Sequence, residues 1–335
     1  MKSVALFNNK GGVGKTTLTY HLAHMLQRLG QRVLAVDLDP QSNLTANFLN
    51  DDDLSVLWEE SDRQAGSHAA DSTMHAPTVA AAVRPIREGI GDVLLCEPIP
   101  IGPDGLFLLA GDLTLSTFED RLSEAWPKGF TGDPAALRTT TAFHRIVQSA
   151  SRAIDADVVL IDVGPNLGAI NRAALLTADT VLIPLAADLF SLRGLQNLGP
   201  TLRTWRRTWQ TKVLPDLPPG IDAPVGSMTP IGYVIMQPTM RLDRPVKAYR
   251  RWLDRIPTVF AQAVDGDQTK LSFEIATLRN YQSLMPLAHD ARKPMFDLRT
   301  ADGALGSTQT LVNRCQQDFR ALATELLRRL DAVKV

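Results

Sequence analysis

The segment NNKGGVGKTT, residues 8–17, limits the possible folds of this chain more than any other feature of its sequence. It follows the apolar run SVALFN and precedes KTTLTYHLAHMLQRLG, where leucine and methionine recur at helical spacing, so a strand, a tight loop and a helix are predicted. The next run, RVLAVDLDP, is again typical of a buried strand. This order favours a parallel α/β sheet, in which ligands bind at the carboxyl ends of the strands.

The remaining sequence extends the same pattern. The apolar runs ADVVLID, DTVLIPL and IGYVIM predict further strands, and helices are expected near residues 245–263 and 311–330. We predict an α/β fold with a mostly parallel sheet flanked by helices on both faces, formed by residues 1–335 as a single domain. Residues 50–76, which are acidic and polar, are expected to form a mobile surface insertion, and residues 213–230 a Pro/Gly-rich linker.

Composition excludes several classes of protein. A net charge of -1 argues against a protein that coats nucleic acid by bulk charge, so any nucleic-acid binding needs a local basic patch. The two cysteines, Cys96 and Cys315, lie far apart outside any metal motif, and we interpret them as buried thiols in a reducing compartment. No apolar run reaches the roughly 20 residues that a membrane-spanning helix needs. A cytoplasmic protein is therefore expected.

The glycine-rich loop predicts a phosphate site. Gly11, Gly12 and Gly14 let backbone N–H groups turn inward around phosphate oxygens, towards which the following helix directs its positive end. Lys15 is expected to contact the β- and γ-phosphates of ATP, and Thr16 to bind Mg²⁺. A simple tight turn is the alternative, but the strand before the loop and the helix after it favour phosphate binding. The predicted nucleotide-binding residues are Asn9, Lys10, Gly11, Gly12, Val13, Gly14, Lys15, Thr16 and Thr17, with Gln237 after the IGYVIM strand as a positional hypothesis for adenine.

Two other predicted strands end in acidic residues. Asp162 ends VVLID, where a carboxylate can reach the neighbouring phosphate loop, and it is expected to bind Mg²⁺ rather than only to cap a turn. Asp37 and Asp39 end the strand RVLAVDLDP, and two acids so close together favour a role in nucleotide hydrolysis. The predicted metal-binding residues are Thr16, Asp39 and Asp162.

These motifs together resemble the ParA/MinD family of deviant Walker-A ATPases, and most closely its ParA-type DNA partition members. The resemblance rests on KGGVGKTT, VDLDPQSNLT, VVLIDVGPNLGAINRAALLTADTVLIPL and LFSLRGL, which cover most of residues 1–200, and it continues loosely through RNYQSLMPLAHDARKPMFDL. Residues 50–135 and 215–230 do not match clearly. One departure is Gly164, which stands where the family often has proline.

The resemblance implies roles that spacing alone does not give. In this family ATP joins two subunits, and the lysine that matches Lys10 reaches the phosphates of the partner's ATP. Lys10, Lys15 and Asp39 are thus the predicted catalytic residues, with both lysines offsetting charge on the transferred phosphoryl group and Asp39 positioning the attacking water. Asp162 would belong to a switch that senses the γ-phosphate. The resemblance further implies a homodimer in the ATP state and slow hydrolysis, stimulated by a ParB-like or cargo-adaptor protein.

Two basic stretches are candidates for DNA contact. In RLDRPVKAYRRWLDRI, four basic residues fall on one face of the predicted helix, and LRTWRRTW places three arginines among tryptophans. The resemblance implies that an ATP-bound dimer binds DNA without sequence preference through such residues, which would also make it nucleoid-associated. A solvated surface is the alternative. The residues concerned are Arg203, Arg206, Arg207, Arg244, Lys247, Arg251 and Arg255.

Other functions on the same fold stay open. A MinD-like positioning ATPase would bind membrane through an amphipathic C-terminal helix, and DFRALATELLRRLDAVKV has this pattern, although a helix docked on the sheet has it too. We expect docking, and therefore no membrane partner. A metabolic ATP-dependent enzyme is a further alternative, whereas an iron protein of the nitrogenase type would need cysteines at other positions.

Overall fold

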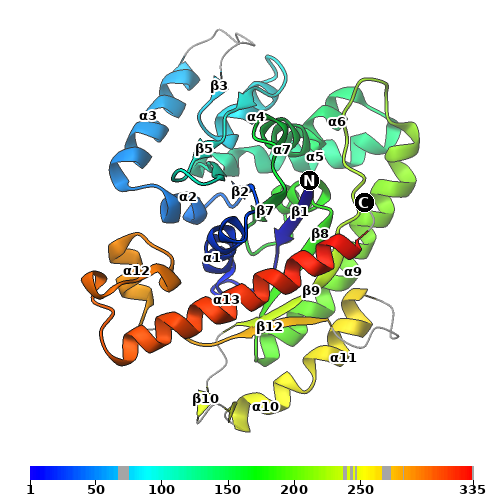
Figure 1. The fold of residues 1–335 in the computed structure, drawn as a ribbon. Coiled ribbons are helices and arrows are strands. Elements are labelled where there is room, and N and C mark those ends of the chain that lie inside the picture. The colour runs from blue at the N-terminus through cyan, green and yellow to red at the C-terminus, as the bar shows by residue number, and fades with distance from the viewer. Residues whose placement is uncertain are drawn as a thin grey trace.

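The computed structural model describes residues 1–66, 75–236, 240–241, 244–245, 247–265, 273–281 and 283–333. Its centre is an eight-stranded sheet in the order β12-β9-β8-β1-β7-β2-β6-β5 (Figure 1). All neighbouring strands in it run parallel except β5 and β6. The strands are β1 (Lys2–Leu6), β2 (Val33–Asp37), β5 (Ile99–Pro100), β6 (Leu106–Leu109), β7 (Val158–Asp162), β8 (Thr180–Ala186), β9 (Thr229–Met236) and β12 (Glu274–Leu278), and two small pairs join β3 (His75–Ala76) to β4 (Leu95–Cys96) and β10 (Met240–Arg241) to β11 (Arg244–Pro245).

Helices cover both faces of this sheet, which confirms the predicted α/β architecture (Figure 1). Side chains alternate along each strand, so Val4 and Leu6 pack into one apolar layer while Ala5 and Phe7 pack into the other. The helices are α1 (Lys15–Arg28), α2 (Asn43–Phe48), α3 (Asp51–Gly66), α4 (Val79–Glu88), α5 (Glu119–Lys128), α6 (Pro134–Thr140), α7 (Ala142–Ala153), α8 (Ala169–Thr177), α9 (Leu189–Lys212), α10 (Lys247–Leu253), α11 (Ile256–Phe260), α12 (Met285–Ala291) and α13 (Ser307–Ala332).

The register of the strands brings the acidic strand ends together. Leu6 of β1 lies opposite Asp162 of β7, and Asp162 lies opposite Asp37 of β2. The loop that follows β1 and the two acids therefore meet at one edge of the sheet, as the parallel arrangement predicts. The single-domain division remains a prediction.

Two segments differ from the sequence-based expectation. Residues 50–76, expected as a mobile surface insertion, include the 16-residue helix α3, which is anchored through Leu54 and Ser61, both 7% exposed. Residues 67–74 of this segment lie outside the described residues. Ser61 Oγ donates a hydrogen bond of 2.9 Å to Asp112. The acidic and polar composition of this segment concealed a helix that buries only one side.

The single helix expected over residues 245–263 is also wrong. The chain forms β11, then α10, and then a separate helix α11. Pro257 lies at the start of α11, where a residue without a backbone N–H begins a helix but cannot continue one. The predicted basic face is divided as a result.

The terminal helix α13 is docked on the sheet, as expected. Phe319, Leu322 and Leu326 are buried in the same apolar layer as α1, and Figure 1 shows α13 crossing that face. The apolar side of the helix is therefore covered by the protein itself. In the part of the chain that the structure describes, no helix has the length and apolar character that crossing a bilayer requires.

Of the two histidines of α1, His21 is a core residue and His24 is half-buried. His21 is 4% exposed, and its ring bridges α1 to residue 295: Nδ1 lies 2.7 Å from the Thr17 carbonyl, and Nε2 accepts a hydrogen bond from Met295 N. Burial lowers the pKa of His21 to about 4 and the pKa of His24 to about 3. Both rings are consequently neutral in the folded protein at neutral pH.

We expect His24→Phe to reduce the acid sensitivity of the protein. Because the pKa of His24 is lower in the folded state, the unfolded chain binds the extra proton, and stability falls as pH decreases from about 6.5 towards 3. Phenylalanine fits beside Tyr20 and Phe48, whose rings already contact His24. Chemical denaturation at pH 7 and pH 5 should show a loss smaller by on the order of 1–2 kcal/mol in the variant than in the wild type.

Comparing the variant with the wild type also separates the pH dependence caused by His24 from the opposite pH dependence caused by Asp37. Burial raises the pKa of Asp37 to about 6, which makes the protein less stable as pH rises through the same range, equally in both proteins. An identical pH dependence in the two proteins would contradict the assignment of His24 as a neutral residue in the folded protein.

Candidate active site

The loop between β1 and α1 has the backbone geometry of an anion cradle. Gly12 and Gly14 adopt φ angles of 72° and 91°, in the left-handed region where glycine is favoured. Gly14 precedes α1, and no side chain caps the N–H groups of the first turn. An anion at this position would be hydrogen-bonded by backbone donors and stabilised by the helix dipole.

Two asparagines shape the start of the loop. Asn8 is buried; its Nδ2 donates to the Pro184 carbonyl at 2.6 Å, and its Oδ1 accepts from the backbone N of Lys10 at 3.0 Å. Asn9 packs so closely on α9 that a Cβ added at Gly194 would lie 2.7 Å from Asn9 Oδ1. Sequence reasoning missed Asn8, although a buried polar residue ending an apolar strand is a detectable signal. The predicted residue Val13 buries its side chain in the core, which leaves only its backbone to face a ligand.

Lys15, Thr16 and Asp162 lie together at the edge of the sheet. Thr16 Oγ1 donates a 2.7 Å hydrogen bond to Asp162 Oδ2, and Thr19, which the sequence did not indicate, contacts Asp162 Oδ1 at 3.3 Å. Asp162 has no exposed surface; burial raises its pKa to about 7, and Asp37 adds to the effect. Burial lowers the pKa of Lys15, and Asp162 and Asp39 oppose this shift. A lysine and a carboxylate buried side by side at a loop of this kind can hold an anion and a cation together.

The two acids of the β2 end differ in their surroundings. Asp37 is fully buried, and its Oδ2 accepts hydrogen bonds from the backbone and hydroxyl of Thr45 at 2.8 and 2.7 Å. Asp37 therefore anchors α2, which is a structural task that the sequence-based interpretation did not assign to it. Asp39 uses Oδ1 to accept from Gln41 N at 3.0 Å, whereas its Oδ2 has no hydrogen-bond partner within the described residues. Of these two acids, only Asp39 keeps a carboxylate oxygen available for a ligand.

Lys10, the additional lysine of the glycine-rich loop, makes its contact within its own chain. Lys10 Nζ forms an ion pair with Asp188, and it also lies 5.9 Å from the centre of the Phe190 ring. Asp188 additionally caps α9 by accepting from Ser191 N at 2.8 Å. Burial opposes ionisation of Asp188, but the hydrogen bonds from Lys10 and Ser191 hold its pKa below the ordinary value. Asp188 is a contact that the sequence analysis did not identify.

The remaining predicted nucleotide residues are placed less centrally. Thr17 lines a cavity of about 260 Å³ between α1, α2 and α12, together with Tyr20, Asn47 and Met285. Gln237 lies outside the described residues.

The basic residues proposed for DNA contact lie on α9, on β11, on α10 and just before α11. Arg203 uses its guanidinium to donate to the carbonyls of Ala263 and Val264, so this arginine is committed to packing α9. Arg206 and Arg207 line a shallow surface depression on α9, where Arg207 is exposed.

The second group is dispersed by the break in the expected helix. Arg244 lies in β11, Lys247 in α10 and Arg255 just before α11. Arg251 is exposed and lies 4.4 Å from the centre of the Trp252 ring. The expectation that Arg244, Lys247, Arg251 and Arg255 share one helical face is wrong.

Comparison with known proteins decides the family. A family model described as an AAA domain matches residues 1–214, which is more than half of the chain. The chain belongs to the ParA/MinD family of P-loop ATPases. The chromosome-partitioning ATPase Soj of Thermus thermophilus is 33% identical to this ParA/MinD-family chain over 211 residues, which cover 62% of this chain and 63% of the relative. A putative replication protein A of Rhizobium rhizogenes is 31% identical over 250 residues, or 70% of this chain and 54% of that protein.

Solved structures agree with this ParA/MinD fold. A putative plasmid partition protein of Borrelia burgdorferi, bound to AMPPNP, superimposes with a TM-score of 0.60 at 17% identity and covers 98% of this chain and 99% of its own. At such identity the likeness concerns the fold. The chain spans less than two thirds of the length of the curated relatives named here. Its activity is therefore proposed from the geometry of its own site and not taken from these relatives.

Proposed function

We propose that this protein is a cytoplasmic, Mg²⁺-dependent ATPase of the partition type, which dimerises around ATP and hydrolyses it to ADP and phosphate. The contact between Thr16 and the buried Asp162, directly beneath the glycine loop, carries the proposal. Asp162 accepts hydrogen bonds from the hydroxyl groups of Thr16 and Thr19 and lies near the ammonium of Lys15, and a hydroxyl–carboxylate pair beside a phosphate cradle suits Mg²⁺.

The residues present fit both ATP and Mg²⁺. Gly11 and Gly12 leave room for phosphate oxygens, since a Cβ at either position would meet nothing within 4 Å. Thr16 and Asp162 would hold the metal, with Asp39 adjacent, while Lys15 would contact the β- and γ-phosphates. When bound, Mg²⁺ would neutralise charge on the phosphate oxygens.

Hydrolysis requires a positioned water, and Asp39 is the residue suited to this task. Its Oδ1 is fixed by Gln41 N, so its available Oδ2 is directed by a rigid loop. A carboxylate held in this way can orient a water molecule and accept its proton. Lys15 stabilises the charge on the transferred phosphoryl group from its own subunit.

Dimerisation would use the surface around Lys10. Leu189 and Phe190, beside Lys10 at the start of α9, are 46% and 73% exposed, which is unusual for such large apolar side chains. In an ATP-bound dimer Lys10 would leave Asp188 and reach the phosphates of the second subunit. The ATP phosphates then replace Asp188 as the acidic partner.

The partition role further implies DNA and a protein partner. Among the predicted DNA residues of α9, Arg207 is exposed, whereas Arg206 is half-buried and donates a 3.4 Å hydrogen bond to the Ser227 carbonyl. A dimer would present two copies of this part of α9. Non-specific DNA binding would make the protein nucleoid-associated, and a ParB-like or cargo-adaptor protein would stimulate hydrolysis to segregate a plasmid, chromosome region or protein cargo. The MinD-like alternative loses its main support, because the apolar side of α13 is buried.

Solution mass in different nucleotide states tests this function. We expect a monomer of about 37 kDa with ADP and a dimer with ATP and Mg²⁺, measured by light scattering. Random DNA duplex added to the same samples should bind only in the ATP state, with an affinity that falls as salt rises. A monomer with every nucleotide, together with absent ATP hydrolysis, would contradict the proposal.

A further inference from the structure

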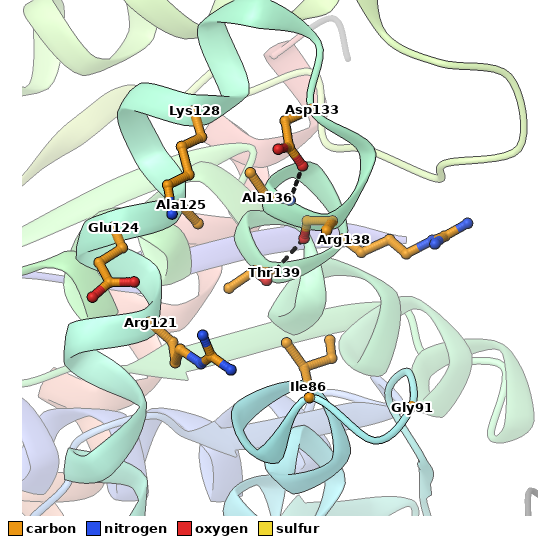
Figure 2. A pocket seen from close by; sticks show the side chains of 12 residues that line it. Ile86, Gly91, Arg121, Glu124, Ala125, Lys128, Asp133, Ala136, Arg138 and Thr139 are labelled. Carbon is orange, nitrogen blue, oxygen red and sulfur yellow. Dashed lines mark hydrogen bonds between the residues drawn. The ribbon is translucent and has the colours of Figure 1, made fainter.

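Helix α5 has two sides with different surroundings. One side, carrying Arg121, Glu124 and Lys128, lines a pocket of about 320 Å³ that α4 and α6 complete (Figure 2). Its first residue, Glu119, does not line this pocket and instead reaches α8. Helix α8 follows the loop that begins directly after Asp162, so α5 contacts the element next to the proposed Mg²⁺ ligand.

Glu119 supplies the N-terminal cap of α8 from 50 residues upstream. Its Oε1 accepts from Ala169 N at 2.6 Å and its Oε2 from Ile170 N at 2.8 Å. The residue that precedes α8, Gly168, has no side chain and provides no cap. Both carboxylate oxygens thus bind backbone donors that a helix otherwise leaves unpaired, at the end where the helix dipole favours negative charge.

Gly168 makes this approach possible. A Cβ added there would lie 2.6 Å from Glu119 Oε1, which is closer than real Cβ contacts. The backbone at Gly168 has a φ of -75°, which any residue can adopt. A side chain at residue 168 would therefore displace the Glu119 carboxylate, although the backbone conformation there permits any residue.

The loop between Asp162 and α8 is connected at its other end to Asp39. Asn171 of α8 accepts from Gly164 N at 3.1 Å and donates to the Gly164 carbonyl at 2.9 Å. A Cβ at Gly164 would lie 3.3 Å from Asp39 Oδ1, so the backbone of the loop packs on that carboxylate. Any displacement of α8 would move residue 164 relative to Asp39.

A second contact strengthens the attachment of α5 to α8. The guanidinium of Arg172 lies 4.4 Å from the centre of the Trp126 ring. Trp126 belongs to α5 and follows Glu119 by two helical turns. Helix α5 therefore holds α8 at its first N–H groups and again at Arg172.

We propose that Glu119 is a positioning residue for hydrolysis: by capping α8 it holds the loop of residues 163–168 in register with Asp39. This inference rests on the proposed ATPase function. It assigns a role in the reaction to a side chain from the part of the sequence that showed no clear match to the family motifs.

Steady-state kinetics of Glu119→Gln test the proposal. Glutamine presents an amide NH₂ to one of the two N–H donors, so the cap is half lost while the side-chain size is kept. We expect kcat for ATP to fall about tenfold, the smaller end of what losing a hydrogen bond to a charged group produces, with KM within about twofold of wild type. The matched control is Glu124→Gln on the pocket side of the same helix, which should behave as wild type.

The outcomes separate this inference from the proposed function. Wild-type kcat in Glu119→Gln, or an equal loss in Glu124→Gln, overturns the role of Glu119 while the ATPase function stands. If wild-type protein does not hydrolyse ATP, both fall.

A double-mutant cycle gives a second test should Glu119→Gln fail to fold. Gly168→Ala alone places a methyl group 2.6 Å from Glu119 Oε1 and 2.9 Å from Asn166 Oδ1, whereas in a Glu119→Ala background the contact with Glu119 is removed and only the one with Asn166 remains. We expect Gly168→Ala to reduce kcat less in the Glu119→Ala background than in wild type. Additive effects would show that the two residues do not act together and would overturn the proposal.

Discussion

Lys10→Ala is expected to abolish ATP-dependent dimerisation while leaving ATP binding by the monomer largely intact. Lys10 is about one third exposed, and its ammonium lies at α9 beside the exposed Phe190 ring, so truncation leaves no buried cavity. In the proposed dimer its charge offsets phosphate charge of the second subunit across a desolvated interface. Removal of one partner of such a pair typically costs 2–5 kcal/mol, or about 30-fold or more in the dimerisation constant. Light scattering with ATP and Mg²⁺ measures the effect.

Asp188→Asn is the matched control for this variant. Asparagine is as good an N-cap as aspartate, so α9 should remain capped, but the charge that pairs with Lys10 within the subunit is removed. We expect Asp188→Asn to dimerise at an ATP concentration equal to or lower than wild type requires. An ATP-dependent dimer of Lys10→Ala with wild-type affinity would contradict the proposed role of Lys10.

Asp39→Asn is expected to trap the ATP-bound dimer. The amide oxygen can still accept from Gln41 N, which preserves the loop, but the side chain can no longer accept a proton from water. General-base assistance is typically worth 10²–10⁴-fold, so kcat should fall by about two orders of magnitude or more. Single-turnover hydrolysis measures the loss, and the dimer should persist for correspondingly longer.

The stability of Asp39→Asn serves as the internal control. Since the Asp39 side chain makes one hydrogen bond within the described residues, the variant should unfold at nearly the wild-type temperature and bind ATP normally. Hydrolysis at the wild-type rate would assign the water-positioning role to another group. Loss of ATP binding would instead indicate that Asp39 holds the loop.

Much of the site could be predicted because its signals are local. The spacing of Gly11, Gly12, Gly14 and Lys15 predicts the cradle, since the strand before it and the helix after it are encoded by neighbouring residues. The ends of β2 and β7 were also readable, because a buried parallel strand is a continuous apolar run and Asp162 interrupts it abruptly. The residues alone do not distinguish Asp37 from Asp39, because their separate tasks depend on Thr45 and Gln41, and only the family resemblance singled out Asp39.

The basic residues were predicted less well, because their positions depend on whether the helix is continuous and on which hydrogen bonds each side chain makes in the folded protein. Periodicity placed four cations on one helix, but Pro245 and Pro257 divide that stretch into β11, α10 and α11. Arg203 and Arg207 are both followed by Thr-Trp in the sequence, yet only the packing of α9 against residues 263–264 shows that the Arg203 guanidinium is hydrogen-bonded within the protein.

The sequence alone determined the sheet, the phosphate loop and the acids at its edge, because hydrophobic periodicity and glycine spacing act over a few residues. The tertiary structure alone decided which distant side chains complete the site. Asp188 pairs with Lys10 across 178 positions, and Glu119 caps α8 across 50. Such contacts have no local signature, since each partner residue is compatible with many environments and only the folded sheet brings the two within hydrogen-bonding distance.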